Sequence, residues 1–209
     1  MSDPVFYKTL RKGQRGTHAD YRYPVGRWTR KVSGGLVACS NGYHVATADQ
    51  LLDWLADEVW SVEVEEPQPA GNKWVCRRVR LVERVMTERE VRLFAADCAE
   101  HVLPLFEAEY PTDSRPREAI AAARAYADGK ITAGQLNAAR DAAWAAADAA
   151  WDAAGAAADS ALAAARDSAL VAAADAAWVA RDAARVGGGA AEKTWQTNRL
   201  TDYLQGRAG

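Results

Sequence analysis

The chain has 209 residues, with 26 Lys and Arg, 28 Asp and Glu, and a formal net charge of −2. This near-neutral charge argues against a protein whose main role is to coat nucleic acid, because binding phosphates requires a basic surface. We expect no transmembrane helix, since no run of about 18 apolar residues is free of charges, and no signal peptide. Three widely spaced cysteines, Cys39, Cys76 and Cys98, exclude a disulfide scaffold and favour a cytoplasmic location.

Composition divides the chain near residue 86. Residues 1–86 carry 13 basic and 10 acidic residues and four of the seven prolines, whereas Ala dominates residues 87–209. We therefore predict the α+β class, with a small α+β domain over residues 1–86 and an all-α, Ala-rich helical bundle over residues 87–209.

The first half contains strand, turn and cap signals in quick succession. β-branched and aromatic residues predict the strands, and the Thr47–Gln50 segment reads as a capping box that begins a helix. The predicted elements, in chain order, are a strand at 5–10, a hairpin with arms at 28–32 and 36–39, a helix at 48–58, a strand at 62–65 and a long strand at 74–85.

The second half reads as helical throughout. Capping boxes at Thr87 and Thr132 each predict a helix start. Pro104 falls inside the first helical pattern and is expected to kink or break it. A second helix is expected from Asp113 or Ser114 to a glycine stop at 128–129, and a last helix from about Ala190 to Leu204.

More than half of the residues from Ala138 to Val186 are Ala, the best helix former. Their three Trp residues do not share one face, so we expect either a helix break near residues 166–168 or two buried faces. The Trp residues are interpreted as core packing. A stripe of aspartates at 141, 148, 152 and 159 is interpreted as a solvated face rather than a metal site, since no His accompanies it.

No segment carries a convincing catalytic signature, but a few residues are candidates. His44 follows a predicted strand in Asn41-Gly42-Tyr43-His44 and is available for acid–base work or ligand stacking. Glu63 and Glu65 share one face of a strand, where they either orient a ligand or simply face solvent. The candidate ligand-binding residues are Tyr7, Tyr43, His44, Glu63 and Glu65, of which His44 and Glu65 are the catalytic candidates.

Two further groups have simpler interpretations. Arg77, Arg78 and Arg80 on the next strand are expected to be cross-strand ion partners of the glutamates, which weakens the case for a nucleic-acid patch. Asp97, Cys98 and His101 have the helical spacing of metal ligands, but no further ligand is evident and a buried thiol is ordinary, so we predict no metal site.

The first half resembles a small domain of unknown function found in bacterial and phage proteins. The resemblance covers roughly residues 5–66 and is carried by Tyr7-Lys8, Tyr23-Pro24-Val25-Gly26, Val62-Glu63-Val64 and the core Cys39-Ser40-Asn41-Gly42-Tyr43-His44. It implies no catalytic residues.

The second half resembles helical proteins classed as immunity proteins. The segment Asp97-Cys98-Ala99-Glu100, the segment Arg115-Pro116-Arg117, the Ala/Trp tract and the closing Trp195 to Leu204 carry the resemblance over about residues 87–204. It implies a cytoplasmic protein that binds and neutralises a toxin. The glycines at 187–189 interrupt the helix expected from that resemblance.

More distantly, the order of a strand, a Gly-aromatic-His loop and a Glu-x-Glu strand is similar to ADP-ribosyltransferase folds. That resemblance implies NAD as a cofactor, with Glu65 at the nicotinamide ribose and His44 nearby. The usual Arg or His on the first strand is missing, since this strand offers only Tyr7 and Lys8.

These observations favour a non-catalytic, cytoplasmic interaction protein without a cofactor, immunity-like or from a phage or mobile-element conflict system. Its expected partner is a protein, either a toxin or a host factor, and a homodimer is also compatible with long helices of low bulk. The alternative is an NAD- or nucleotide-binding enzyme centred on residues 1–86, and it requires His44 and Glu65 to converge in a cleft.

Overall fold

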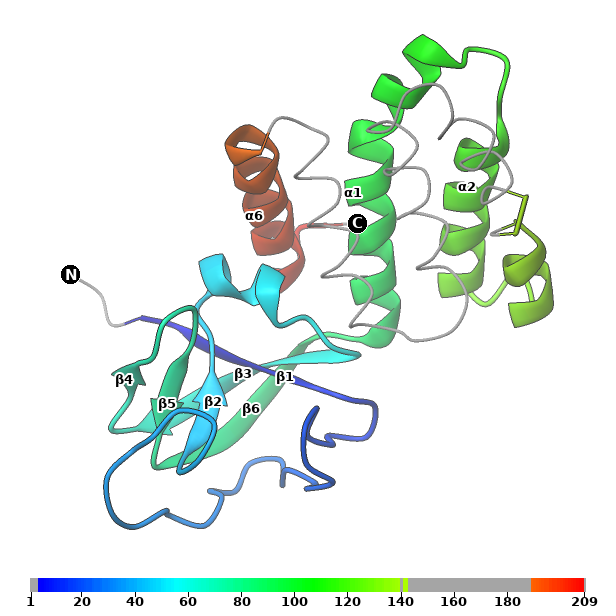
Figure 1. The fold of residues 1–209 in the computed structure, drawn as a ribbon. Helices are drawn as coiled ribbons and strands as arrows, with labels where there is room; N and C mark the ends of the chain where they lie inside the picture. The colour runs from blue at the N-terminus through cyan, green and yellow to red at the C-terminus, as the bar shows by residue number, and fades with distance from the viewer. Residues whose placement is uncertain (1–3, 140, 143–188, 209) are drawn as a thin grey trace.

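The computed structural model describes residues 4–139, 141–142 and 189–208, and shows strands followed by helices, as predicted for the α+β class (Figure 1). Within these residues, six strands form two small sheets. The first sheet has the order β1-β3-β6 and the second the order β2-β5-β4, and all named pairs are antiparallel. The strands are β1 (Phe6–Leu10), β2 (Tyr43–Val45), β3 (Glu58–Glu65), β4 (Gln68–Pro69), β5 (Trp74–Cys76) and β6 (Arg78–Met86).

Strand β1 shows how the head, residues 4–86, builds its interior. Phe6, Lys8 and Leu10 are buried, while Tyr7 and Thr9 between them are half-buried. Side chains along a strand alternate between its two faces, so this pattern places Lys8 on the same face as two core residues. A lysine at an inward position is unusual, because burial of an ammonium is costly.

The head contains one short helical element, η1 (Ala48–Asp53). The Thr47 amide donates to the Gln50 side chain at 3.2 Å, as the predicted capping box requires. The prediction of an α-helix over 48–58 was wrong: the element is a 3₁₀ helix of six residues. Residues 58 onward instead enter β3, which pairs with both β1 and β6. The gain from two strand ladders outweighs the local helical pattern.

Two other local predictions were also corrected. The segment around residues 33–35 is no hairpin of two strands; Val37 bridges only Asn41, and Asn41 Nδ2 donates to the carbonyls of Ser33 and Gly35. The long strand expected at 74–85 is divided at Arg77 into β5 and β6, which belong to different sheets.

The helical part comprises α1 (Glu88–Glu109), α2 (Arg115–Ala127) and α6 (Ala190–Leu204), and a further helix begins at residue 133. The Thr87 amide donates to the Glu90 carboxylate at 2.7 Å, which confirms the capping box of α1. Helix α1 continues past Pro104, so the expected break does not occur. Pro104 and Glu100 are both exposed, and the carbonyl that lacks a helical donor therefore lies on the solvent-facing side.

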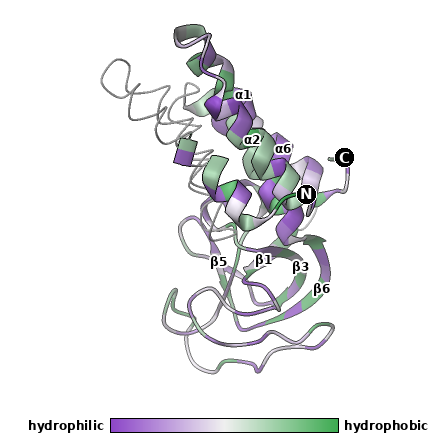
Figure 2. Cartoon of the chain, turned by 90° about the vertical axis from the view of Figure 1, so that its right-hand side faces the viewer, coloured by the Kyte–Doolittle hydropathy of each residue, from purple (hydrophilic) through white to green (hydrophobic). Residues whose placement is uncertain are grey.

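The largest hydrophobic cluster joins the head to the helices. It contains Leu51 and Leu52 of η1, Phe94 of α1, and Leu200 and Leu204 of α6. In Figure 1, η1 lies between the sheets and the helices α1 and α6, and α6 contacts η1. Figure 2 shows that each of these helices mixes hydrophobic and hydrophilic residues, as amphipathic helices do. The boundary predicted at residue 86 is thus spanned by one continuous core.

Most of the Ala-rich tract, including its three Trp residues and the predicted break near 166–168, lies outside the described residues. The same holds for the aspartates at 148, 152 and 159. No helix in the described part of the chain is long and apolar enough to cross a membrane.

Candidate functional site: a basic, aromatic cavity in the head

The head contains a cavity of about 590 Å³. Its walls come from β1, β2, the loop at 16–23, the loop that ends at Gly42, and the residues Trp54 and Lys73. The lining is rich in rings and in basic groups, and no Asp or Glu lines it. The ring-bearing residues are Tyr7, Tyr21, Tyr23, Tyr43 and Trp54, and the basic residues are Lys8, His18, His44 and Lys73.

Lys8 is the buried cation of this cavity. Its side chain donates from Nζ to the carbonyl oxygen of His44 at 2.8 Å, and the same atom lies 4.6 Å from the centre of the Tyr23 ring. Burial lowers the pKa of Lys8 to about 8, although the nearby Cys76 thiol opposes this shift. No ion pair to a carboxylate is found for Lys8 in the described part of the chain.

His44 is held as a neutral hydrogen-bond acceptor. Its Nε2 accepts a hydrogen bond from the backbone amide of Cys39 at 2.9 Å. Burial, with the charges of Lys73, Lys8 and His18, lowers the pKa of His44 to about 4, so the imidazole is uncharged at neutral pH. Its Nε2 lone pair is therefore already used by the backbone, and it does not serve as a free general base.

The loop before His44 has an unusual backbone. Cys39 has a φ of 62°, and Gly42 has a φ of 138°. A Cβ on Gly42 would lie 2.4 Å from Val75 Cγ2 and 3.2 Å from the Cys76 carbonyl oxygen. Glycine is thus required where this loop packs against β5. The exposed Cys39 also places its Sγ 3.1 Å from the Lys73 ammonium, at the wall of the cavity.

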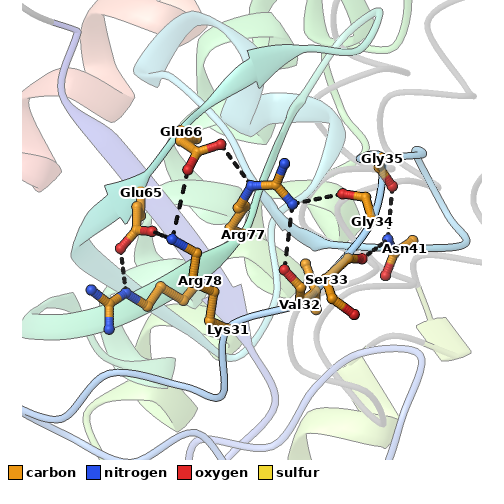
Figure 3. Close-up of polar contacts among 10 residues, drawn as sticks. All are labelled: Lys31, Val32, Ser33, Gly34, Gly35, Asn41, Glu65, Glu66, Arg77 and Arg78. Atoms are coloured by element: carbon orange, nitrogen blue, oxygen red, sulfur yellow. Dashed lines mark hydrogen bonds and ion pairs between the residues drawn. The ribbon is translucent and has the colours of Figure 1, made fainter.

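The two candidate glutamates lie elsewhere. Glu63 pairs with Arg80 and Glu65 with Arg78, which are their cross-strand partners on β6, as predicted. Glu65 also pairs with Lys31 (Figure 3). These contacts lower the pKa of Glu65, mainly through the hydrogen bond from Lys31.

Figure 3 shows the rest of this polar cluster. Arg77 pairs with Glu66 at 2.6 Å and donates to the carbonyl of Gly34 at 2.7 Å, so it joins the loop at 32–35 to the sheet. Neither Glu63 nor Glu65 lines the cavity. The structure therefore brings Tyr7, Tyr43 and His44 together and leaves the two glutamates in surface ion pairs.

Sequence reasoning missed several cavity residues, and Lys8 above all. The signal was present, since Lys8 stands two residues from Phe6 and two from Leu10 on a strand, which places it on the inward face. Trp54 and Lys73 carried no such signal. They meet in space, with Lys73 Nζ 4.5 Å from the Trp54 ring centre, only because η1 and the turn before β5 are adjacent in the fold.

The helical part contains a different polar cluster, centred on Asp97 of α1. The Asp97 carboxylate accepts from Arg199 Nε at 2.7 Å and from the Tyr203 hydroxyl at 2.8 Å, and it pairs with Arg124 Nη2 at 2.7 Å. The Asp97 side chain is only 8% exposed. It therefore acts as a hub that fixes α1, α2 and α6 to one another.

The second metal-ligand candidate, His101, is also engaged in structure. Its ring stacks on Trp195 with ring centres 3.8 Å apart and planes 2° apart, and its Nε2 lies 3.2 Å from Glu192 of α6. Cys98 lies in the hydrophobic cluster. Among the described residues, no group of three or more His, Cys, Asp or Glu side chains could hold a metal ion.

The geometry thus defines a sheet-bearing head with a ligand-sized cavity, joined to helices held together by a buried ionic hub. A profile of the family described as Imm-5 like putative immunity protein matches residues 83–203, which is more than half of the chain. The chain therefore belongs to this immunity protein family. Searches of curated proteins and of solved structures gave no significant match.

Proposed function

We propose that the protein works in the cytoplasm as an immunity protein that binds a protein toxin and neutralises it without catalysing a reaction. The observation that carries this proposal is the family match over residues 83–203, which includes β6 from residue 83, α1, α2 and most of α6.

The described helices have the rigidity that a binding surface needs. The Asp97 hub joins three helices, and a bidentate contact from Arg117 to Glu107 adds a second link between α1 and α2. A surface that is already ordered loses less conformational entropy when a partner binds. This supports inhibition by binding, in which the immunity protein covers a site on the toxin.

The two catalytic candidates of the head, His44 and Glu65, do not form an acid–base pair. His44 Nε2 is occupied by the Cys39 amide, and Glu65 is held by two cations outside the cavity. The NAD-dependent alternative requires a cleft that is lined by both His44 and Glu65. The cavity in the head is lined by His44 but not by Glu65.

The test is neutralisation by the full chain. The protein is used as bait in cells of its source, each captured partner is expressed in a sensitive host, and growth is measured with and without the bait protein. We expect one captured partner to arrest growth when it is expressed alone, and growth to be restored when the bait protein is expressed with it. If the full chain restores growth against no captured partner, the proposal is wrong.

A matched pair of variants tests whether the helical part forms the interface. Leu105 on α1 is 47% exposed and lies in the matched region, whereas Val82 on β6 is 50% exposed and lies just before it. Leu105→Lys is expected to weaken the complex about tenfold or more, as loss of an apolar contact at an interface does. Val82→Lys should leave the affinity unchanged, and equal affinities of both variants would contradict this placement.

A further inference from the structure

The cavity in the head is not used by the function proposed above. All of its lining residues lie between Tyr7 and Lys73, before the family match begins at residue 83. The protein therefore has a ligand-sized space in a part of the chain for which the immunity role gives no purpose.

The charge of this space is one-sided. Lys8 is 8% exposed, and its contacts are with uncharged groups: the His44 carbonyl oxygen at 2.8 Å and the Tyr23 ring at 4.6 Å. Burial of an ammonium without a counter-ion is unfavourable, and an anion that enters the cavity would remove that cost.

Neighbouring groups strengthen the preference for an anion. Lys73 and the exposed His18 also line the cavity, and no carboxylate does. The ion pairs described for the head involve other lysines and arginines, and none of them includes Lys8. A concave surface lined by one sign of charge concentrates the opposite ion.

The walls favour a flat ring. Tyr21 and Tyr23 meet edge to face with ring centres 4.8 Å apart, and Tyr23 and Tyr43 do so at 6.1 Å. Trp54 adds an indole next to Lys73. Aromatic faces stack on planar rings of every base type, and this interaction tolerates differences in sequence or substituents.

We propose that this cavity binds a small anion that carries a planar ring, of the mononucleotide class, with Lys8 as the counter-ion of its phosphate and the tyrosines and Trp54 as the walls for its base. The volume of about 590 Å³ lies within the range of small-molecule sites. Unlike the NAD-dependent alternative from the sequence, this site does not use Glu65.

The experiment titrates the full chain by calorimetry at pH 7 with adenosine monophosphate, inorganic phosphate and adenosine. Adenosine monophosphate is expected to bind at least about tenfold more tightly than either fragment, because only the whole molecule offers both the charge and the ring. Equal binding of phosphate and adenosine monophosphate would contradict the proposed recognition of a planar ring by the aromatic walls. No binding of adenosine monophosphate at millimolar concentration would overturn the whole proposal.

Variants locate the site. Lys8→Met keeps the length of the side chain, removes the charge and is expected to weaken binding about tenfold or more. Lys31→Met makes the same change at a surface ion pair outside the cavity and should leave binding unchanged, as should Glu65→Gln. A thermal melt confirms that each variant is folded.

If Lys8→Met does not fold, Tyr21→Ala provides the second test. Tyr21 is 40% exposed and lines the cavity, so its removal leaves the core intact and should still lower the affinity for adenosine monophosphate. Unchanged affinity in the folded Lys8→Met variant, or in Tyr21→Ala if Lys8→Met is unfolded, would overturn the assignment.

Discussion

The helical part and the head each bury a charged side chain, and they differ in what surrounds it. Asp97 is met by Arg124, Arg199 and the Tyr203 hydroxyl, so its charge is balanced within the protein. Lys8 is met by a carbonyl oxygen and an aromatic ring, and its charge is not balanced. From this difference we infer that the Asp97 charge stabilises the fold, whereas the Lys8 charge is available to a ligand.

The largest loss of stability is expected from removing the Asp97 carboxylate, which tests whether this balanced charge holds the helices together. Asp97→Ala removes the buried carboxylate that Arg124 and Arg199 share. Because both arginine side chains are about one-third exposed, we expect the free energy of unfolding to fall by about 2–3 kcal/mol. Denaturant titration of the full chain measures it. Glu100→Ala is the matched control, because Glu100 also pairs with Arg124 but is 54% exposed, and it should cost at most about 1 kcal/mol. Equal losses would show that Asp97 is no hub.

The unbalanced charge should appear in the pH dependence of stability. The pKa of Lys8 falls from 10.5 to about 8 on folding, so between these pH values the unfolded chain binds more protons at this residue than the folded chain does. Stability of the wild type therefore rises with pH across that window, relative to Lys8→Met, by of the order of 3 kcal/mol. The measurement is the difference in unfolding free energy between the two proteins, determined at about pH 7.5 and again at about pH 10.5.

Three titratable groups next to Lys8 do not titrate in that window in the folded protein. The pKa of His44 is about 4, burial raises the pKa of Cys76 to about 12, and burial also raises the pKa of Tyr23. The difference between wild type and Lys8→Met thus isolates the ammonium. A difference that stays constant with pH would mean that Lys8 keeps an ordinary pKa and that its charge is balanced after all.

A smaller effect concerns the loop that forms one wall of the cavity. Gly42→Ala puts a Cβ 2.4 Å from Val75 Cγ2 at a φ of 138°, and we expect a loss of about 2 kcal/mol in stability. Gly35→Ala in the same loop meets nothing within 4 Å and should be nearly neutral. Thermal melts of both variants compare them, and a Gly42→Ala variant as stable as Gly35→Ala would contradict the close packing of this loop on β5.

Local signals predicted much of the scaffold. The capping box at Thr87, the stop before Gly129 and the helix from Ala190 to Leu204 were all evident in the sequence, because caps and glycine stops act over only a few residues. The ion pairs of Glu63 and Glu65 with β6 were also predicted, since strand spacing determines them.

The remaining features depend on contacts between distant segments. The pattern at 48–58 is helical, but from Glu58 onward the chain pairs with two strands that no local window contains. Asp97 was considered only as a metal ligand, which was rejected, and its role as a hub was not predicted, because Arg124 and Arg199 reach it only through tertiary packing. Lys8 was visible as a residue on a strand, but the cavity around it is built from five separate segments of the chain.

The position of α6 has a consequence for synthesis of the chain. Residues 190–204 cover η1, whose leucines at 51 and 52 belong to the same hydrophobic cluster as Leu200 and Leu204. At roughly 5–20 residues per second, translation of the intervening segment takes on the order of ten seconds or more. During that time the leucines of η1 lack the part of their cover that α6 provides, so chaperones that bind apolar segments have an opportunity to act before the ribosome has released α6.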